Sequence, residues 1–198
     1  MSLSIIILAA GKGTRMKSEI PKIFHKVGNY PMLFHVLDTS ESLRPTNITL
    51  VISENIKEFL NQISKKYKKI NFAFQKNQLG TGDAVLAAFS NKQSLKADLT
   101  LILYADTPLI TKNTLSKCLR NFKNKKSDLS VLSMDPNNLD HSYGRLVTFG
   151  GKLEKIVEKS ELKNAEKKIK LCNSGIMIIR TKFLYEKLKK IKNKNNKK

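Results

Sequence analysis

The stretch Leu3–Met16, which reads L-S-I-I-I-L-A-A-G-K-G-T-R-M, decides the fold of this 198-residue chain. Its first part, Leu3–Ala9, is a nearly continuous apolar run rich in β-branched residues, which predicts a strand covered on both faces. A Gly-rich turn follows at once. Strands buried on both faces are typical of parallel sheets flanked by helices, so the N-terminus predicts an α/β domain.

Strand-like and helix-like runs alternate through the first two thirds of the chain. The predicted strands are Leu3–Ala9, Ile48–Ile52, Asn71–Phe74, Leu99–Tyr104 and Asp128–Met134, then the shorter Arg145–Thr148, Leu153–Glu158 and Leu171–Ile179. The predicted helices are Pro31–Leu43, Ile56–Tyr67, Thr81–Phe89 and Thr111–Phe122. Repeated β-α units demand a mainly parallel sheet with right-handed crossovers. We therefore expect a Rossmann-like, mostly parallel mixed sheet in a three-layer α/β/α domain over residues 1–186, followed by a Lys/Asn-rich tail over 187–198.

The net charge of +21 could suggest a nucleic-acid partner, because Lys and Arg neutralise phosphates. However, 32 of the 37 basic residues are Lys and only five are Arg, whereas base edges and phosphates favour the planar Arg fork. Residues 151–198 alone hold 16 bases and five acids. We therefore expect a solvated basic surface and no nucleic-acid partner.

The cysteines and the apolar N-terminus both indicate a cytoplasmic protein. Cys118 and Cys172 have neither metal-ligand spacing nor a CxxC pattern, so we expect buried thiols in a reducing compartment. The apolar run Ile5–Ala10 is too short to span a bilayer and ends in a Gly-rich turn. We expect no membrane partner; a homo-oligomer stays open.

The turn after the first predicted strand has the composition of a phosphate-binding loop. In open α/β sheets, ligands bind beyond the carboxyl ends of the strands. Gly11 and Gly13 let the backbone approach phosphate oxygens, and Ala9 and Ala10 leave room for a flat base. The nearby cations are Lys12, Arg15 and Lys22. The turn is neither a P-loop nor a dinucleotide fingerprint, and taken alone it would also suit an ordinary strand–loop turn.

The string L-A-A-G-x-G-T-R-M followed by Pro21-Lys22 is similar to the signature of the sugar-nucleotide pyrophosphorylase superfamily. Within this superfamily, Ser4–Arg180 most resembles the uridyltransferase domain of bifunctional N-acetylglucosamine-1-phosphate uridyltransferases. Later landmarks come in the family's order: Gln75, Gln78–Gly82, Tyr104–Asp106, Tyr143–Arg145, Glu158 and Asn173–Gly175. The resemblance implies a nucleotidyltransferase that converts UTP and N-acetylglucosamine 1-phosphate into UDP-N-acetylglucosamine and pyrophosphate, for peptidoglycan and lipopolysaccharide precursors.

The resemblance also implies roles for individual residues. The nucleotide-binding residues would be Leu8, Ala9, Ala10, Gly11, Gly13, Gln75, Gly80 and Thr81. The sugar-phosphate contacts would be Tyr104, Gly144, Glu158 and Asn173. Arg15 and Lys22 would be catalytic, and Asp106 would bind Mg²⁺.

Four of these residues also have an interpretation that needs no ligand. Without the family, Glu158 would pass as a salt-bridged strand residue. Gln75 offers a donor and an acceptor that suit the edge of uracil, but it also suits a surface turn. Thr81 or a neighbour would cap the helix that follows. Asp106 ends a buried strand, where a carboxylate is costly unless it is paired or metal-bound. The alternative for Asp106 is a helix cap, because Thr107-Pro108 follows.

The sequence departs from the family at two places. Ala105 stands where the family usually has Gly, and its methyl group could crowd the sugar phosphate. The chain stops before the family's closing strands, including an Asn that shares the magnesium, and before the acetyltransferase half, so we expect a domain truncated at its C-terminal end. The alternatives are a MobA-like nucleotidyltransferase with another triphosphate or acceptor, a non-catalytic nucleotide-binding fragment, and an electrostatic RNA-binding protein.

Overall fold

The computed structural model describes residues 1–11, 13, 16–90, 92–137 and 141–191. The chain folds into two compact units. The first comprises Met1–Leu129 together with Ile178–Lys198, and the second comprises Ser130–Met177. The domain bounds expected from the sequence, 1–186, stay a prediction, and each unit is described by itself.

A parallel sheet forms the centre of the first unit. Its strands are β1 (Leu3–Leu8), β4 (Asn47–Ile52), β5 (Ile70–Phe74) and β6 (Leu99–Tyr104), in the order β5-β4-β1-β6. Every pair of neighbours in this group is parallel. All of β4 and nearly all of β1 and β6 are buried, which agrees with their mostly apolar sequences.

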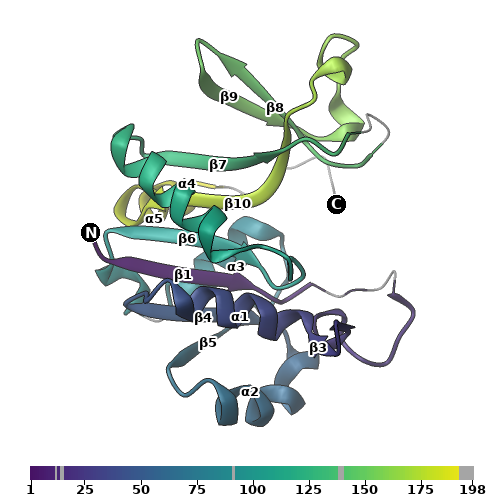
Figure 1. Ribbon diagram of the computed structural model, residues 1–198, viewed down its shortest axis with the longest axis vertical. Coiled ribbons are helices and arrows are strands. Elements are labelled where there is room, and N and C mark those ends of the chain that lie inside the picture. Colours follow the sequence, from purple (N-terminus) through teal and green to yellow (C-terminus); the bar gives the residue numbers. More distant parts are fainter. Residues whose placement is uncertain (12, 14–15, 91, 138–140, 192–198) are drawn as a thin grey trace. The chain divides into compact units, whose positions relative to one another are not determined.

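Helices cover both faces of this sheet. On one face α1 (Met32–Ser42) contacts α4 (Lys112–Asn124), and on the other α3 (Thr81–Ala88) contacts α5 (Thr181–Leu188). Figure 1 shows α1 in front of β1 and β4, with α3 behind them. The short helix α2 is Leu60–Lys66, and single turns of 3₁₀-helix occur at Lys22–Phe24 and Ser94–Lys96. The predicted fold class, a mostly parallel sheet with flanking helices, is confirmed.

The second unit is antiparallel where its pairing is resolved. Strands β8 (Arg145–Phe149) and β9 (Lys152–Val157) form a hairpin, and β8 also pairs with β10 (Cys172–Arg180). The hairpin turns at Gly150 and Gly151, which both have positive φ. Strand β7 (Leu129–Met134) pairs with β10, and single 3₁₀ turns lie at Lys159–Glu161 and Glu166–Lys168.

Two local elements differ from the sequence prediction. The predicted helix Ile56–Tyr67 begins as a 3₁₀-helix, Glu54–Phe59, and becomes α-helical only at Leu60. Its apolar residues Ile56 and Phe59 are three apart, a spacing that also suits a 3₁₀-helix. In addition, α5 continues to Leu188, two residues into the predicted tail. The last part of that tail, residues 192–198, lies outside the described residues.

The register of the parallel strands brings their carboxyl ends to one edge. Leu8, the last residue of β1, lies opposite Val51 on one side and Tyr104 on the other. Ile52 in turn lies opposite Phe74 at the end of β5. The loops that follow β1, β5 and β6 therefore emerge side by side. Within the described residues, no helix combines the length and apolarity needed to cross a bilayer.

Candidate functional site

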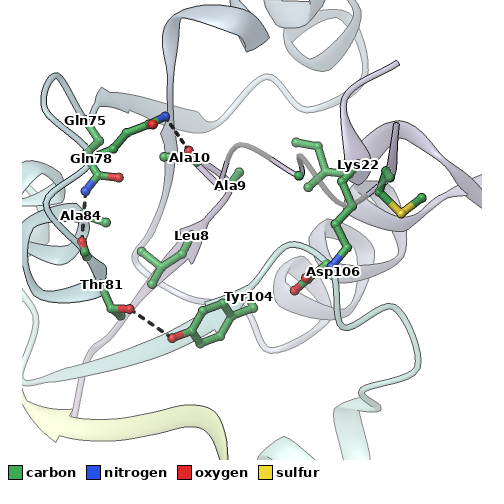
Figure 2. Close-up of a pocket in the computed structure, with 15 residues that line it drawn as sticks. Leu8, Ala9, Ala10, Lys22, Gln75, Gln78, Thr81, Ala84, Tyr104 and Asp106 are labelled. Carbon is green, nitrogen blue, oxygen red and sulfur yellow. Dashed lines mark hydrogen bonds and ion pairs between the residues drawn. The ribbon is translucent and has the colours of Figure 1, made fainter. Parts of the chain in front are cut away.

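A cavity of about 540 Å³ opens at this edge of the first unit. Such a volume falls in the range of about 300–1,000 Å³ that is usual for small-molecule sites. All eight residues predicted to bind the nucleotide line it: Leu8, Ala9, Ala10, Gly11, Gly13, Gln75, Gly80 and Thr81. Lys22, Tyr104 and Asp106 line it as well (Figure 2). The structure thus brings together residues from three loops that are far apart in the sequence.

Other predicted residues fall outside this cavity or outside the described chain. Lys12 and Arg15 belong to the residues that the structure does not describe. Ala105, whose methyl group could have crowded the site, is buried with 1% of its surface exposed and does not line the cavity. Four lining residues were not predicted, namely Met16, Ile23, Gln78 and Ala84.

The loop after β5 is held in shape by a buried glutamine. Gln75 is only 7% exposed, so it is not the surface residue that the sequence left as an alternative. Its Nε2 donates to the carbonyl oxygen of Gly80 at 3.0 Å and to Oδ2 of Asp83 at 2.7 Å. The Asp83 carboxylate also accepts from the backbone N–H of Leu79, at 3.4 Å. This network closes the loop between β5 and α3.

Two further contacts tie the loop to its neighbours across the cavity. Gln78 Nε2 donates to the carbonyl oxygen of Ala10, at 2.9 Å, and Thr81 Oγ1 lies 3.5 Å from Tyr104 Oη (Figure 2). Of the caps that the sequence allows for α3, Thr81 or a neighbour, the structure has the neighbour Gly80, and the Thr81 hydroxyl faces Tyr104 instead. Side chains of the loop after β5 and of the start of α3 therefore contact both the loop after β1 and the end of β6.

Lys22 and Asp106 form an ion pair on the opposite wall. Lys22 Nζ lies 2.5 Å from Asp106 Oδ2, and both side chains are about one-third exposed, at 37% and 34% (Figure 2). Asp106 is not the helix cap that the sequence left as an alternative. Helix α4 starts later, and its cap is Thr111, whose side chain accepts from the Thr114 N–H. The carboxylate faces the cavity instead.

The donor set around Asp106 suits a phosphate-bound magnesium ion better than a protein-only metal centre. No cluster of three or more His, Cys, Asp or Glu side chains able to hold a metal occurs among the described residues. Asp106 Oδ2 accepts a hydrogen bond from Lys22. Its other oxygen, Oδ1, has no hydrogen-bond partner among the residues that the structure describes. Mg²⁺ commonly takes one or two carboxylates and completes its shell with phosphate oxygens and water. One carboxylate beside a phosphate-binding turn fits that pattern.

The other predicted sugar contacts gather in the second unit. The backbone N–H of Asn173 donates to the carbonyl of Gly144, at 2.8 Å. A Cβ added to Gly144 would lie 3.0 Å from Ile156 Cγ2 and 3.4 Å from Glu158 Oε1. Arg145 is only 2% exposed, and its guanidinium donates to the Tyr143 carbonyl at 2.7 Å. This contact holds the backbone next to Gly144 in place. Gly144, Glu158 and Asn173 therefore form one cluster.

Residues 5–167 match the family described as "MobA-like NTP transferase domain". The chain belongs to this family. The prediction of a nucleotidyltransferase domain is confirmed by this match, and the curated relatives agree with it.

Those relatives are longer proteins. Over 196 residues the chain is 42% identical to "Bifunctional protein GlmU" of Buchnera aphidicola subsp. Schizaphis graminum, covering 99% of this chain and 41% of that protein. It is 38% identical over 196 residues to the protein of the same name from Alcanivorax borkumensis, covering 98% and 42%. The chain thus spans about two fifths of the length of these relatives.

A solved structure supports the fold of this family member. A Bacillus anthracis crystal structure assigned as a glucose-1-phosphate thymidylyltransferase, in complex with sucrose, superposes with a TM-score of 0.74. The match covers 96% of this chain and 76% of that one, at 20% identity. At this identity the likeness concerns the fold alone.

Gly13 is the glycine of the turn that should tolerate a side chain least. Its φ is +60°, and a Cβ there would lie 3.0 Å from Lys22 Cβ. We expect Gly13→Ala to lower the free energy of unfolding by about 1–3 kcal/mol, since left-handed backbone alone costs an L-residue about 1–2 kcal/mol. Such a change lowers the melting temperature by about 2–4 °C per kcal/mol in a chain of this size.

Two matched glycines separate the causes of this loss. Gly28 has a φ of +58° but nothing within 4 Å of its added Cβ, so Gly28→Ala reports the backbone cost alone. Gly11 has neither a positive φ nor a close neighbour, so Gly11→Ala should leave the melting temperature nearly unchanged. If all three variants melted at the same temperature, the packing of Gly13 against Lys22 would not contribute to the free energy of unfolding.

Proposed function

We propose that this chain transfers the uridylyl group of UTP to N-acetylglucosamine 1-phosphate and releases pyrophosphate. The observation that carries the proposal is the single cavity shared by the Gly11–Gly13 turn, the Gln75–Thr81 loop and the Lys22–Asp106 pair. The glycine turn would bind a phosphate chain, the Gln75–Thr81 loop would bind a base, and the Asp106 carboxylate lies on the wall opposite that loop. The relatives named GlmU support the choice of sugar. The role proposed for this chain is to supply a cytoplasmic precursor for peptidoglycan and lipopolysaccharide.

The reaction balances without a covalent enzyme intermediate. A phosphate oxygen of the sugar 1-phosphate forms a bond to the α-phosphorus of UTP. The bond from that phosphorus to the oxygen bridging to the β-phosphate breaks in line, and pyrophosphate leaves. Reactions of this kind need positioning and charge neutralisation more than proton transfer. The protein's task is therefore to hold two anionic substrates together.

Different residues of the chain would bind different parts of the two substrates. The Gly11–Gly13 backbone would bind phosphate oxygens, and Lys22 would neutralise the charge that grows on the leaving pyrophosphate, with Arg15 beside it as the family resemblance implies. Gln75, Gly80 and Thr81 would hold the base. When bound at Asp106, Mg²⁺ would supply charge neutralisation at the phosphates. Tyr104 would bind the sugar phosphate in the first unit, and the family resemblance implies sugar contacts for Gly144, Glu158 and Asn173.

The direct test is pyrophosphate release with UTP and N-acetylglucosamine 1-phosphate in the presence of Mg²⁺. We expect release that needs both substrates and the metal. Melting-temperature shifts with each of the four ribonucleoside triphosphates would separate the alternatives, because a ligand stabilises the folded chain by mass action. A shift with UTP but no pyrophosphate release would indicate a non-catalytic nucleotide-binding domain. Release with another triphosphate or acceptor would overturn the choice of substrates.

A further inference from the structure

The side-chain amide of Gln75 has only one orientation that its surroundings accept. A glutamine amide has two N–H donors and one oxygen acceptor. Both donors are used inside the protein, one on the Gly80 carbonyl at 3.0 Å and one on the Asp83 carboxylate at 2.7 Å. A flipped amide would place its oxygen against these two acceptors. Because Gln75 is only 7% exposed, water would do little to weaken that repulsion.

The oxygen of Gln75 is left for a ligand. Gln75 lines the cavity, and its Oε1 has no hydrogen-bond partner among the described residues. Figure 2 shows the amide nitrogen directed to the loop of α3. From the sequence, Gln75 could offer a base both a donor and an acceptor; in the structure it offers an acceptor only.

We propose that Asp83 is a positioning residue that sets the base preference of this site. By holding both donors of the amide with Gly80, Asp83 makes Gln75 an acceptor for a ring N–H, and so selects a nucleobase with an N–H between two carbonyls, as in uracil. Asp83 does not line the cavity, so it acts through Gln75. The inference rests on the proposed nucleotide site and names the chemistry by which that site chooses its base.

Cytosine is the sharpest comparison because its nucleotide differs from that of uracil only at the base edge. Its ring nitrogen N3 carries a lone pair, which would face the Gln75 oxygen and repel it. Its amino group could reach that oxygen only if the ring shifted along its edge, away from the position set by the ribose and triphosphate. The backbone N–H groups of the first turn of α3, at Gly80 and Thr81, have no partner within the helix and can donate to a uracil carbonyl. The site is therefore complementary to uracil and mismatched to cytosine.

The experiment compares the affinities of UTP and CTP by calorimetry for the native chain, Asp83→Ala and Asp83→Asn. For the native chain we expect UTP to bind roughly 10- to 100-fold more tightly, the effect of one unsatisfied buried hydrogen-bonding group. In Asp83→Ala only the Gly80 carbonyl still holds the amide, so its orientation is less fixed and the ratio should fall by about tenfold, through weaker UTP binding and unchanged or tighter CTP binding. Asp83→Asn should keep the ratio, because the Leu79 N–H holds an oxygen in the same place.

Opposite changes for the two nucleotides distinguish positioning from a general structural effect. An equal loss of both affinities in Asp83→Ala, or equal binding of UTP and CTP by the native chain, would overturn the inference. A second measurement needs no ligand. In ¹H–¹⁵N spectra, both Gln75 side-chain amide protons should exchange slowly with water in the native chain and in Asp83→Asn, and one of them should exchange faster in Asp83→Ala, where its acceptor is lost. If no nucleotide bound, the proposed function would fail, and these signals would still decide whether Asp83 positions the amide.

Discussion

Asp106→Asn is expected to slow pyrophosphate release by roughly 10²- to 10³-fold at saturating Mg²⁺, the largest loss of any single substitution considered for this site. The amide keeps the shape of the carboxylate but removes its negative charge, and Mg²⁺ prefers charged oxygen ligands. Little stability should be lost, because the ion pair with Lys22 is about one-third exposed and such pairs contribute about 1 kcal/mol or less. The measurement is the rate of pyrophosphate release against Mg²⁺ concentration.

A readout other than turnover separates metal binding from chemistry. Mn²⁺ can be titrated into the native chain with UTP and followed by electron paramagnetic resonance, and the same titration with Asp106→Asn should show at least about tenfold weaker binding, since one charged ligand is lost. Asp98→Asn is a suitable control, because Asp98 also belongs to the first unit but pairs with Ser2 and the N-terminus, outside the cavity. An Asp106→Asn variant that kept the native rate and Mn²⁺ affinity would remove Asp106 from the site.

The sequence predicts the central sheet of the fold because its strands depend on local runs of apolar residues. Leu3–Ala9 and Leu99–Tyr104 are nearly continuous apolar runs, and they become central strands of a parallel sheet. Once the strands are parallel, their carboxyl ends must share an edge, so the sequence also predicts that the turn at Gly11 and the carboxylate of Asp106 lie close together. The cavity that contains both follows from this topology.

Short elements were harder to predict because few residues determine them. The hairpin of β2 (Lys26–Val27) and β3 (Tyr30–Pro31) was missed, since strands of two residues have no detectable alternation. The turn of this hairpin is nevertheless recognisable in the sequence from its residue types. Gly28 and Asn29 have φ values of +58° and +61°, and both residue types favour such turns between β-forming neighbours.

Side-chain partners were the least predictable part of the site. The sequence predicts that Gln75 can both donate to and accept from a base, yet both of its donors are occupied, one of them by Asp83 eight residues away. The sequence predicts Lys22 as a cation for phosphates, but in the structure it pairs with Asp106, 84 residues away in the chain. A pattern of residue types shows which groups are available, whereas distances between atoms decide which of them remain free for a ligand.

That pairing gives the second large prediction, in which two quantities change in opposite directions. Lys22→Met is expected to slow pyrophosphate release by roughly 10²-fold or more, because a cation near the leaving group is lost. In the absence of nucleotide the same variant should bind Mn²⁺ about fivefold more tightly, since the ammonium group 2.5 Å from Asp106 Oδ2 no longer competes for the carboxylate.

The opposite signs make the result hard to attribute to unfolding, which would weaken both metal binding and turnover. Lys26→Met provides the matched control: it makes the same change in net charge in the same segment, but Lys26 is exposed in β2 and does not line the cavity. We expect Lys26→Met to leave Mn²⁺ binding and turnover within about twofold of the native values, because surface charges away from a site have small effects. If Lys22→Met weakened Mn²⁺ binding, the ion pair could not be a competitor of the metal, and Lys22 would have to act by holding Asp106 in place.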